Sequence, residues 1–252
     1  MFKEINLQND IEYLEKLDDP DQGDYSRTII DLINANTMDL ELASFLVDKV
    51  RSGSSYITGS GPGGIGKTTT MHALLPFVPK NLPFLTALPG EIKPIKQKRH
   101  SVVISNELSD HPPPTYLWDK ELRDYFNLLE SGHILTSNVH ADNHDETFQQ
   151  MVTENDVPEH QFRAINLLIF ICLEGGNPDQ GRIKDNVTPR IVNKVYYSDG
   201  KSPHKLVYSP KEGLSDGPYR NSESEENSQR LLTEIMNTKL RSVSEMRKYY
   251  NG

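Results

Sequence analysis

The sequence contains a single cysteine in 252 residues, so neither an internal disulfide nor a cysteine-ligated zinc site is expected. No stretch approaches the roughly 20 apolar residues of a membrane-spanning helix, and the first residues lack the apolar core of a signal peptide. Basic residues are fewer than acidic ones: the chain has 27 Lys and Arg and 36 Asp and Glu, which gives a net charge of −9. These features predict a cytoplasmic protein and argue against one that binds nucleic acid or anionic lipid mainly by charge.

Patterning divides the chain into four predicted parts. Residues 1–52 carry apolar positions at helical spacing and predict a short helical segment, in which Asp39 is a candidate N-cap. Residues 53–208 alternate strand-like and helix-like pieces, the pattern of an α/β domain with a mostly parallel sheet. Residues 209–228 contain almost no large apolar side chain and predict a flexible linker, and 229–252 predict one amphipathic C-terminal helix.

The α/β part has a definite predicted order of elements. Strands are expected at 55–58, 83–87, 101–105, 133–138, 166–173 and 191–197, and helices at 67–76, 118–131, 144–153 and 158–165. The last two strands flank a polar stretch, 174–189, and are expected to extend the sheet in the antiparallel direction.

Residues 61–68 read GPGGIGKT, a full match to the phosphate-binding loop G-x-x-x-x-G-K-[ST], between a predicted strand and a predicted helix. Glycines allow the backbone to turn its N–H groups inward around phosphates, and the following helix points its positive end at the same anion. Lys67 is expected to reach the β- and γ-phosphates, and the Thr68 hydroxyl to ligate Mg²⁺. The residues predicted to bind ATP are Gly61, Gly63, Gly64, Ile65, Gly66, Lys67, Thr68 and Thr69. The alternative, a glycine-rich turn with a chance Lys-Thr pair, is disfavoured by the flanking strand and helix.

A carboxylate is expected near this loop, at the end of the hydrophobic run 101–105. Glu107 is the candidate that would orient the attacking water, with Mg²⁺ coordination beside Thr68 as an additional role. Asp110, three residues further on, is a candidate supporting group. The alternative for both residues is an acidic side chain exposed to solvent on a surface loop. The presence of a phosphate-binding motif disfavours this alternative for Glu107.

Three segments resemble the family of ATPases that power type II and type IV secretion, pilus retraction and archaellum motors. Residues 106–110, NELSD, are similar to the family's G-E-[IM]-R-D Walker B ending. Residues 130–142, ESGHILTSNVHAD, are similar to its histidine-containing E-T-G-H-L-V-x-x-T-L-H-T-N box. Arg163 with the apolar run 165–172, followed by 190–195, resembles its closing strand pair.

The resemblance runs from about residue 40 to about residue 200 and implies a RecA-like P-loop NTPase core that hydrolyses ATP to ADP with Mg²⁺. It implies that Lys67 and Thr68 take the Walker A roles, Glu107 the Walker B role and His140 the role of a γ-phosphate sensor. It further implies a homo-oligomeric ring, a hexamer, that works on an envelope secretion or pilus machine. Attachment to the inner face of the membrane would then run through partner proteins.

Two departures from the family pattern are visible. The family's "Asp box", T-I-E-D-P-x-E, corresponds here to residues 86–91, TALPGE, which lack the two central acids and predict weaker activation of water. The family's large N-terminal domain, which supplies arginines across subunits, does not fit into about 50 residues. The phosphate-contacting arginine is therefore unassigned, with Arg51, Arg123 and Arg163 as candidates.

Two other functions stay open on the sequence. The chain would act as a nucleotide-binding switch or regulatory subunit if hydrolysis were lost with the Asp-box acids. A RecA-like motor that translocates nucleic acid is disfavoured by the net charge of −9, and one basic cluster is the exception: Lys93, Lys96, Lys98 and Arg99.

Overall fold

The computed structural model describes residues 9–19, 26–111, 114–178, 181–185 and 187–252. Its strands form one eight-stranded sheet in the order β2-β3-β4-β1-β5-β6-β7-β8. The strands are β1 (Tyr56–Gly59), β2 (Phe84–Thr86), β3 (Val102–Ile104), β4 (Ile134–Val139), β5 (Leu167–Leu173), β6 (Arg190–Tyr197), β7 (Lys205–Ser209) and β8 (Gly213–Leu214). The five strands from β2 to β5 in this order are parallel, and β6, β7 and β8 continue the sheet antiparallel.

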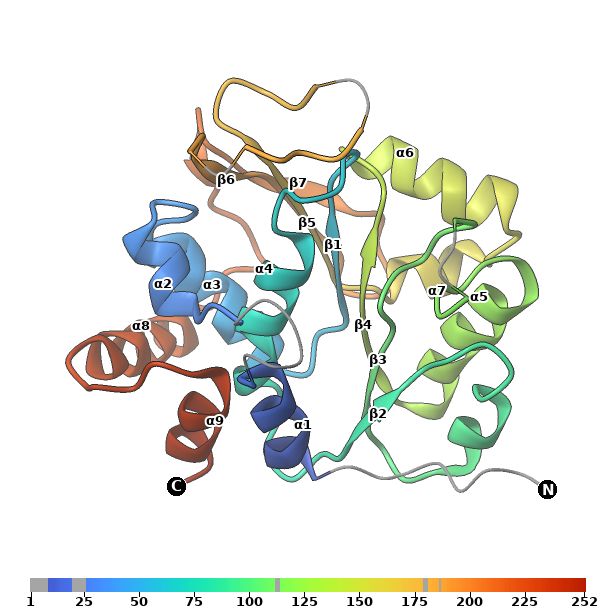
Figure 1. Cartoon of the computed structure of the whole chain (residues 1–252), viewed down its shortest axis with the longest axis horizontal. Helices are drawn as coiled ribbons and strands as arrows, with labels where there is room; N and C mark the ends of the chain where they lie inside the picture. Colours follow the sequence, from blue (N-terminus) through green and yellow to red (C-terminus); the bar gives the residue numbers. More distant parts are fainter. Residues whose placement is uncertain (1–8, 20–25, 112–113, 179–180, 186) are drawn as a thin grey trace.

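Helices cover both faces of the sheet (Figure 1). On one side lie α5 (Asp119–Phe126), α6 (His144–Phe148) and α7 (Glu159–Arg163), and on the other lie α1 (Asp10–Leu17), α2 (Ile29–Asn34), α3 (Leu40–Arg51), α4 (Lys67–Leu74), α8 (Ser222–Met236) and α9 (Val243–Asn251). A hydrophobic core lies on each face of the sheet, and alternate residues of a strand pack into one core or the other, as the two-residue period of a strand requires. In β3, Val102 and Ile104 join the core beneath α1–α4, whereas Val103 joins the core beneath α5 and α7.

The predicted α/β class with a mostly parallel sheet is confirmed. Each of the six predicted strands corresponds to one of β1–β6 within one or two residues, and the predicted antiparallel extension is the β5–β6 pair. The predicted helices continue beyond their α-helical parts as 3₁₀ turns at Leu75–Phe77 and Asn127–Ser131 and as a π-helix at Gln149–Glu154. Asp39 caps α3 as predicted, because its side chain accepts a hydrogen bond of 2.8 Å from the Leu42 amide.

The C-terminal region differs from its prediction in two respects. The segment predicted as a flexible linker, 209–228, contains β8 and the first half of α8, which starts at Ser222 behind the Asn221 cap. The predicted single helix is two helices, because a capping box of Ser242 and Glu245 starts α9 after α8 has ended. Apolar residues at three- and four-residue spacing fit one helix or two, so the pattern alone could not reveal the break.

Both C-terminal helices pack on the body of the molecule. Arg247 of α9 is fully buried and donates hydrogen bonds to the carbonyl oxygens of Pro76, Val78 and Pro79. Its guanidinium also lies 2.8 Å from the Asp10 carboxylate of α1. Among the described residues, no helix is both long and apolar enough to cross a bilayer.

Candidate phosphate-binding site

The phosphate-binding loop connects β1 to α4 at the carboxyl edge of the parallel strands. Gly66 precedes α4 with φ of 111°, a backbone conformation that glycine adopts without strain and other residues avoid. Ile65 is buried in the core and anchors the loop, while Thr68 is exposed in the first turn of α4, followed by Thr69. The loop therefore has the strand-to-helix setting that phosphate binding requires.

Three residues singled out in the sequence meet beside this loop. The Lys67 Nζ lies 3.1 Å from Oε1 of Glu107, which follows β3, and the same oxygen lies 3.0 Å from Nε2 of His140, which follows β4. Lys67 also donates to the carbonyl of Ser60 at 3.1 Å. The side chains of Lys67 and Glu107 are 8% and 9% exposed, so both charges are largely shielded from water.

Each ring nitrogen of His140 faces an acceptor, and Nδ1 in addition lies 3.0 Å from the Lys67 ammonium. Nδ1 lies 2.8 Å from the carbonyl oxygen of Gly61, which can only accept, and Nε2 faces the carboxylate of Glu107. The imidazolium form donates at both nitrogens and satisfies both contacts. The hydrogen bond to Glu107 raises the pKa of His140 above its ordinary value of 6.5, against the opposing effects of burial and of Lys67.

Two carboxylates act on this cluster, that of Glu107 in direct contact and that of Asp142, whose charge raises the pKa of Lys67. Burial alone would raise the pKa of Glu107, but the hydrogen bond from His140 and the charge of Lys67 lower it to about 2. Burial lowers the pKa of the Lys67 ammonium, and the carboxylate of Glu107 offsets part of that shift. Two basic groups thus share one ionised carboxylate, with Lys67 Nζ only 3.0 Å from Nδ1 of His140. An anion placed between them would relieve this crowding.

Asn138 of β4 is a site residue that the sequence analysis missed. Its Nδ2 donates to the Asn106 carbonyl at 2.8 Å and to Thr68 Oγ1 at 3.2 Å, and its Oδ1 accepts from Thr58 Oγ1. This buried amide therefore ties β1, the start of α4 and the end of β3 together. The signal in the sequence was a polar amide within a buried strand, where the partners of its four hydrogen-bonding sites must come from neighbouring strands.

The oxygen groups here suit a hard cation such as Mg²⁺. Thr68 Oγ1 accepts one hydrogen bond from Asn138 and retains a lone pair, and Glu107 provides an ionised carboxylate that contacts the adjacent Lys67. The two residues predicted as metal ligands therefore have the right chemistry to hold the ion.

The other predicted groups have no described contact with the loop. Asp110 forms an exposed pair with His111 at 3.0 Å, and the His111 ring lies 6.1 Å from that of His140, so Asp110 lies at the edge of the site. Arg51 donates to Ser228 and Arg123 to the Asn155 carbonyl, and Arg163 pairs with Glu159 one turn away on α7. None of the three predicted arginines contacts the phosphate-binding loop in the described part of the chain, so those assignments are not supported by the geometry.

A segment between β5 and β6 lies against the loop instead. The Ile183 amide donates to the Gly63 carbonyl at 2.9 Å, and Arg182 pairs with Gly63 in the manner of parallel strands. Asp142 accepts a hydrogen bond of 2.8 Å from the Gly61 amide and another of 2.8 Å from Asn177 of the same segment. The sequence analysis treated this segment only as a polar connection.

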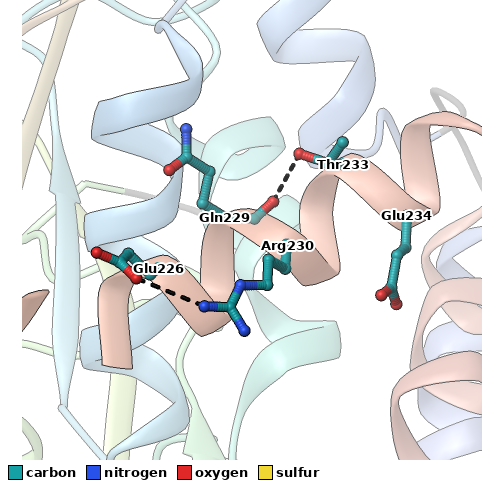
Figure 2. Close-up of a pocket in the computed structure, with 5 residues that line it drawn as sticks. All are labelled: Glu226, Gln229, Arg230, Thr233 and Glu234. Atoms are coloured by element: carbon teal, nitrogen blue, oxygen red, sulfur yellow. Dashed lines mark hydrogen bonds and ion pairs between the residues drawn. The ribbon is translucent and has the colours of Figure 1, made fainter. Parts of the chain in front are cut away.

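Two hollows of the described surface differ in how they relate to this site. Figure 2 shows a shallow pocket of about 320 Å³ on α8, where the lining side chains come from successive turns of one helix. Within it, Arg230 pairs with Glu226 at 3.5 Å, and the Thr233 hydroxyl donates to the Gln229 carbonyl at 2.8 Å. A second hollow, of about 510 Å³, lies beside Asp142 at the base of the segment between β5 and β6.

Two solved structures are similar to this chain. One is the VirB11 ATPase from the type IV secretion system of Brucella suis in complex with sulphate, with a TM-score of 0.44 and 19% identity over 67% of this chain and 54% of that one. The other is the ATPase DotB of Legionella pneumophila, with a TM-score of 0.40 and 10% identity over 88% of this chain and 60% of that one. The chain thus spans less than two thirds of the length of either structure. No protein-family model and no curated protein matches it.

Proposed function

We propose that this chain is a Mg²⁺-dependent ATPase that converts ATP and water to ADP and phosphate. The observation that carries the proposal is the cluster of Lys67, Glu107 and His140, in which two basic groups share one carboxylate at the start of α4. Two basic groups at a helix N-terminus behind a glycine-rich loop favour a polyphosphate ligand.

In the proposed mechanism, the phosphates replace Glu107 as the counter-ion of Lys67. Glu107, released from Lys67, orients the attacking water, and His140 donates a hydrogen bond to the γ-phosphate in place of its present bond to Glu107. Thr68, held by Asn138, would be a ligand of Mg²⁺, and the ion would supply positive charge against the phosphates.

The proposed cellular role follows the family that the sequence resembles. A ring of identical subunits, a hexamer, would use ATP hydrolysis to drive conformational work in an envelope secretion or pilus machine. The chain would then act in the cytoplasm, attached to the inner face of the membrane through partners. Measurement of the assembly mass with and without Mg²⁺ and ATP tests the ring directly.

The decisive experiment for the proposed activity is Mg²⁺-dependent phosphate release by wild type, Lys67→Ala and a control, Lys239→Ala. Lys239 is exposed between α8 and α9, far from the loop in sequence, and its removal should leave turnover unchanged. We expect Lys67→Ala to lower kcat by about 10²-fold or more, because one preorganised cation is lost. Hydrolysis by Lys67→Ala at the wild-type rate would refute the proposal.

A second candidate function is a nucleotide-binding switch with little hydrolysis. It is favoured by the engagement of Glu107 with both Lys67 and His140, and by the missing acids in residues 86–91. ATP affinity and steady-state turnover separate the two functions. Micromolar binding with negligible phosphate release would favour the switch.

A further inference from the structure

Arg182 is the third basic residue that the fold brings to the phosphate-binding loop. Its backbone runs alongside Gly63, and the next amide, that of Ile183, donates to the Gly63 carbonyl at 2.9 Å. A Cβ atom on Gly64 would lie 2.5 Å from the carbonyl oxygen of Ile183, so the two backbones approach as closely as they do only because Gly64 has no side chain. Figure 1 shows the segment that contains Arg182 passing over the carboxyl end of β1.

Contacts on either side of Arg182 hold this segment in place. Ile183 packs against the hydrophobic core on the α4 side of the sheet. Asn177 donates to Asp142 at 2.8 Å and to the Ser60 hydroxyl at 3.3 Å, and Asp142 in turn binds the Gly61 amide. The backbone of Arg182 is therefore positioned by its neighbours, and its own side chain is not needed for that purpose.

The Arg182 side chain is exposed and forms no hydrogen bond or ion pair with any residue that the structure describes. Its charge nevertheless acts on Tyr116, a neighbour of Glu107. Burial and the Glu107 carboxylate raise the pKa of Tyr116, and the charge of Arg182 opposes that rise. The Arg182 side chain also lies against the loop itself, since a Cβ atom on Gly63 or on Gly64 would lie 3.6 Å from its Cγ.

We propose that Arg182 contacts the terminal phosphate of the nucleotide bound by its own chain and serves as the phosphate-contacting arginine in cis. This inference rests on the proposed ATPase function. In the reaction, the oxygen of water bonds to the γ-phosphorus while the bond to the bridging oxygen breaks and its electron pair leaves with ADP. The proton of the water passes to the phosphate product, and the guanidinium of Arg182 stays protonated while it stabilises the γ-phosphoryl oxygens.

The test compares wild type with Arg182→Ala, Arg182→Lys and the matched control Lys184→Ala. Lys184 is an exposed cation two residues further along the same segment and has no described contact with the loop. Three quantities are measured: kcat with Mg²⁺ and ATP, the affinities for ADP and for ATPγS, and the trapping of ADP with aluminium fluoride, which mimics the transferring phosphoryl group.

For Arg182→Ala we expect kcat to fall by about 10²-fold or more, with ADP affinity within about twofold of wild type because ADP lacks the γ-phosphate. The preference for ATPγS over ADP should fall about tenfold, and trapping with aluminium fluoride should be lost. Arg182→Lys should keep part of the preference, because Lys supplies the charge without the planar fork. Lys184→Ala should match wild type in every measurement.

The outcomes distinguish the role of Arg182 from the proposed ATPase function on which that role rests. Wild-type nucleotide binding together with an unchanged ATPγS preference in Arg182→Ala would overturn the role of Arg182 alone. Absence of nucleotide binding by the wild-type chain would overturn the ATPase function and this inference with it. Recovery of turnover on mixing Arg182→Ala with Lys67→Ala subunits would show that the arginine acts across subunits and would overturn the assignment in cis.

Discussion

Glu107 accepts two basic groups through a single oxygen, and this arrangement determines what a ligand must displace. The 3.1 Å contact with Lys67 and the 3.0 Å contact with His140 both end on Oε1. Because the pair of Lys67 and Glu107 is largely buried, its attraction is stronger than that of an exposed ion pair. Phosphate binding therefore competes with an internal counter-ion for Lys67.

This competition predicts opposite effects of Glu107→Gln on binding and on hydrolysis. The neutral amide no longer pairs with Lys67, so ATP affinity should increase several-fold, roughly 1 kcal/mol. Turnover should fall by about 10²-fold or more, because water would no longer be oriented by a carboxylate. Titration with a fluorescent ATP analogue and a phosphate-release assay measure the two effects on one preparation. Weaker nucleotide binding in Glu107→Gln would contradict the idea of an internal counter-ion.

His140 gives nucleotide binding a predicted dependence on pH. Since the folded-state pKa of His140 is raised above 6.5, the imidazolium and its bond to Glu107 are fully present below pH 6.5 and are lost as pH rises through the raised value. ATP affinity should fall over the same range, because a neutral ring provides less positive charge for phosphate. The measurement is ATP affinity between about pH 6 and pH 9 for wild type and His140→Gln. An equally steep decline in His140→Gln would assign the dependence to another group.

At the scale of elements, the parallel strands were predictable because they are short, fully buried apolar runs bounded by polar turns. β3 and β5 are buried along almost their whole length, which produces a continuous hydrophobic signal. β7 and β8 gave no such signal, since β7 begins with two exposed residues and β8 has only two residues. The glycine loop and Glu107 could be singled out from sequence motifs, and His140 from the family resemblance. The structure brings Lys67, Glu107 and His140 together, and their roles in a reaction stay predictions.

Asn138 and Arg182 could not be assigned from spacing. Their positions depend on which strands become neighbours and on contacts across more than 60 residues of sequence. Examples are the side-chain hydrogen bond from Asn138 to Thr68 and the backbone pairing of Arg182 with Gly63. β4 lies between β1 and β3 in the sheet, and this insertion is what brings Asn138 beside both the loop and Asn106. The sequence order of the strands does not reveal their order in space.

The docking of α9 depends on one buried side chain, which leads to a prediction of stability. Arg247→Met removes a guanidinium that donates to three carbonyls of 76–79 and that is the cationic partner of the Asp10 carboxylate. We expect the free energy of unfolding to fall by about 3 kcal/mol. Arg230→Met on α8 is the control, since its pair with Glu226 is exposed and should contribute little. Denaturant unfolding of both variants measures the difference, and equal losses would show that the buried contacts of Arg247 do not stabilise the fold.

At the scale of the whole molecule, one edge of the sheet collects every charged group assigned to the reaction. Lys67, Glu107, His140 and Arg182 come from four connections at the carboxyl ends of β1, β3, β4 and β5. Parallel strands deliver their carboxyl ends to the same edge, which is why ligands bind there in open α/β sheets. With Arg182 acting in cis, a single chain contains the cation, the carboxylate and the arginine of the proposed site.

This completeness predicts how turnover responds to dilution. Suppose that subunit contacts only couple the motions of a ring. Phosphate release per chain should then stay within about twofold of its value in the assembly when dilution dissociates the subunits, because no catalytic group is lost with the neighbouring subunit. Sites that need an arginine from an adjacent subunit would instead lose about 10³-fold or more on dissociation. Turnover and assembly mass measured on the same dilution series distinguish the two. A parallel collapse of both would mean that a neighbouring subunit supplies a group that this chain lacks, and the role of Arg182 would then be confined to binding.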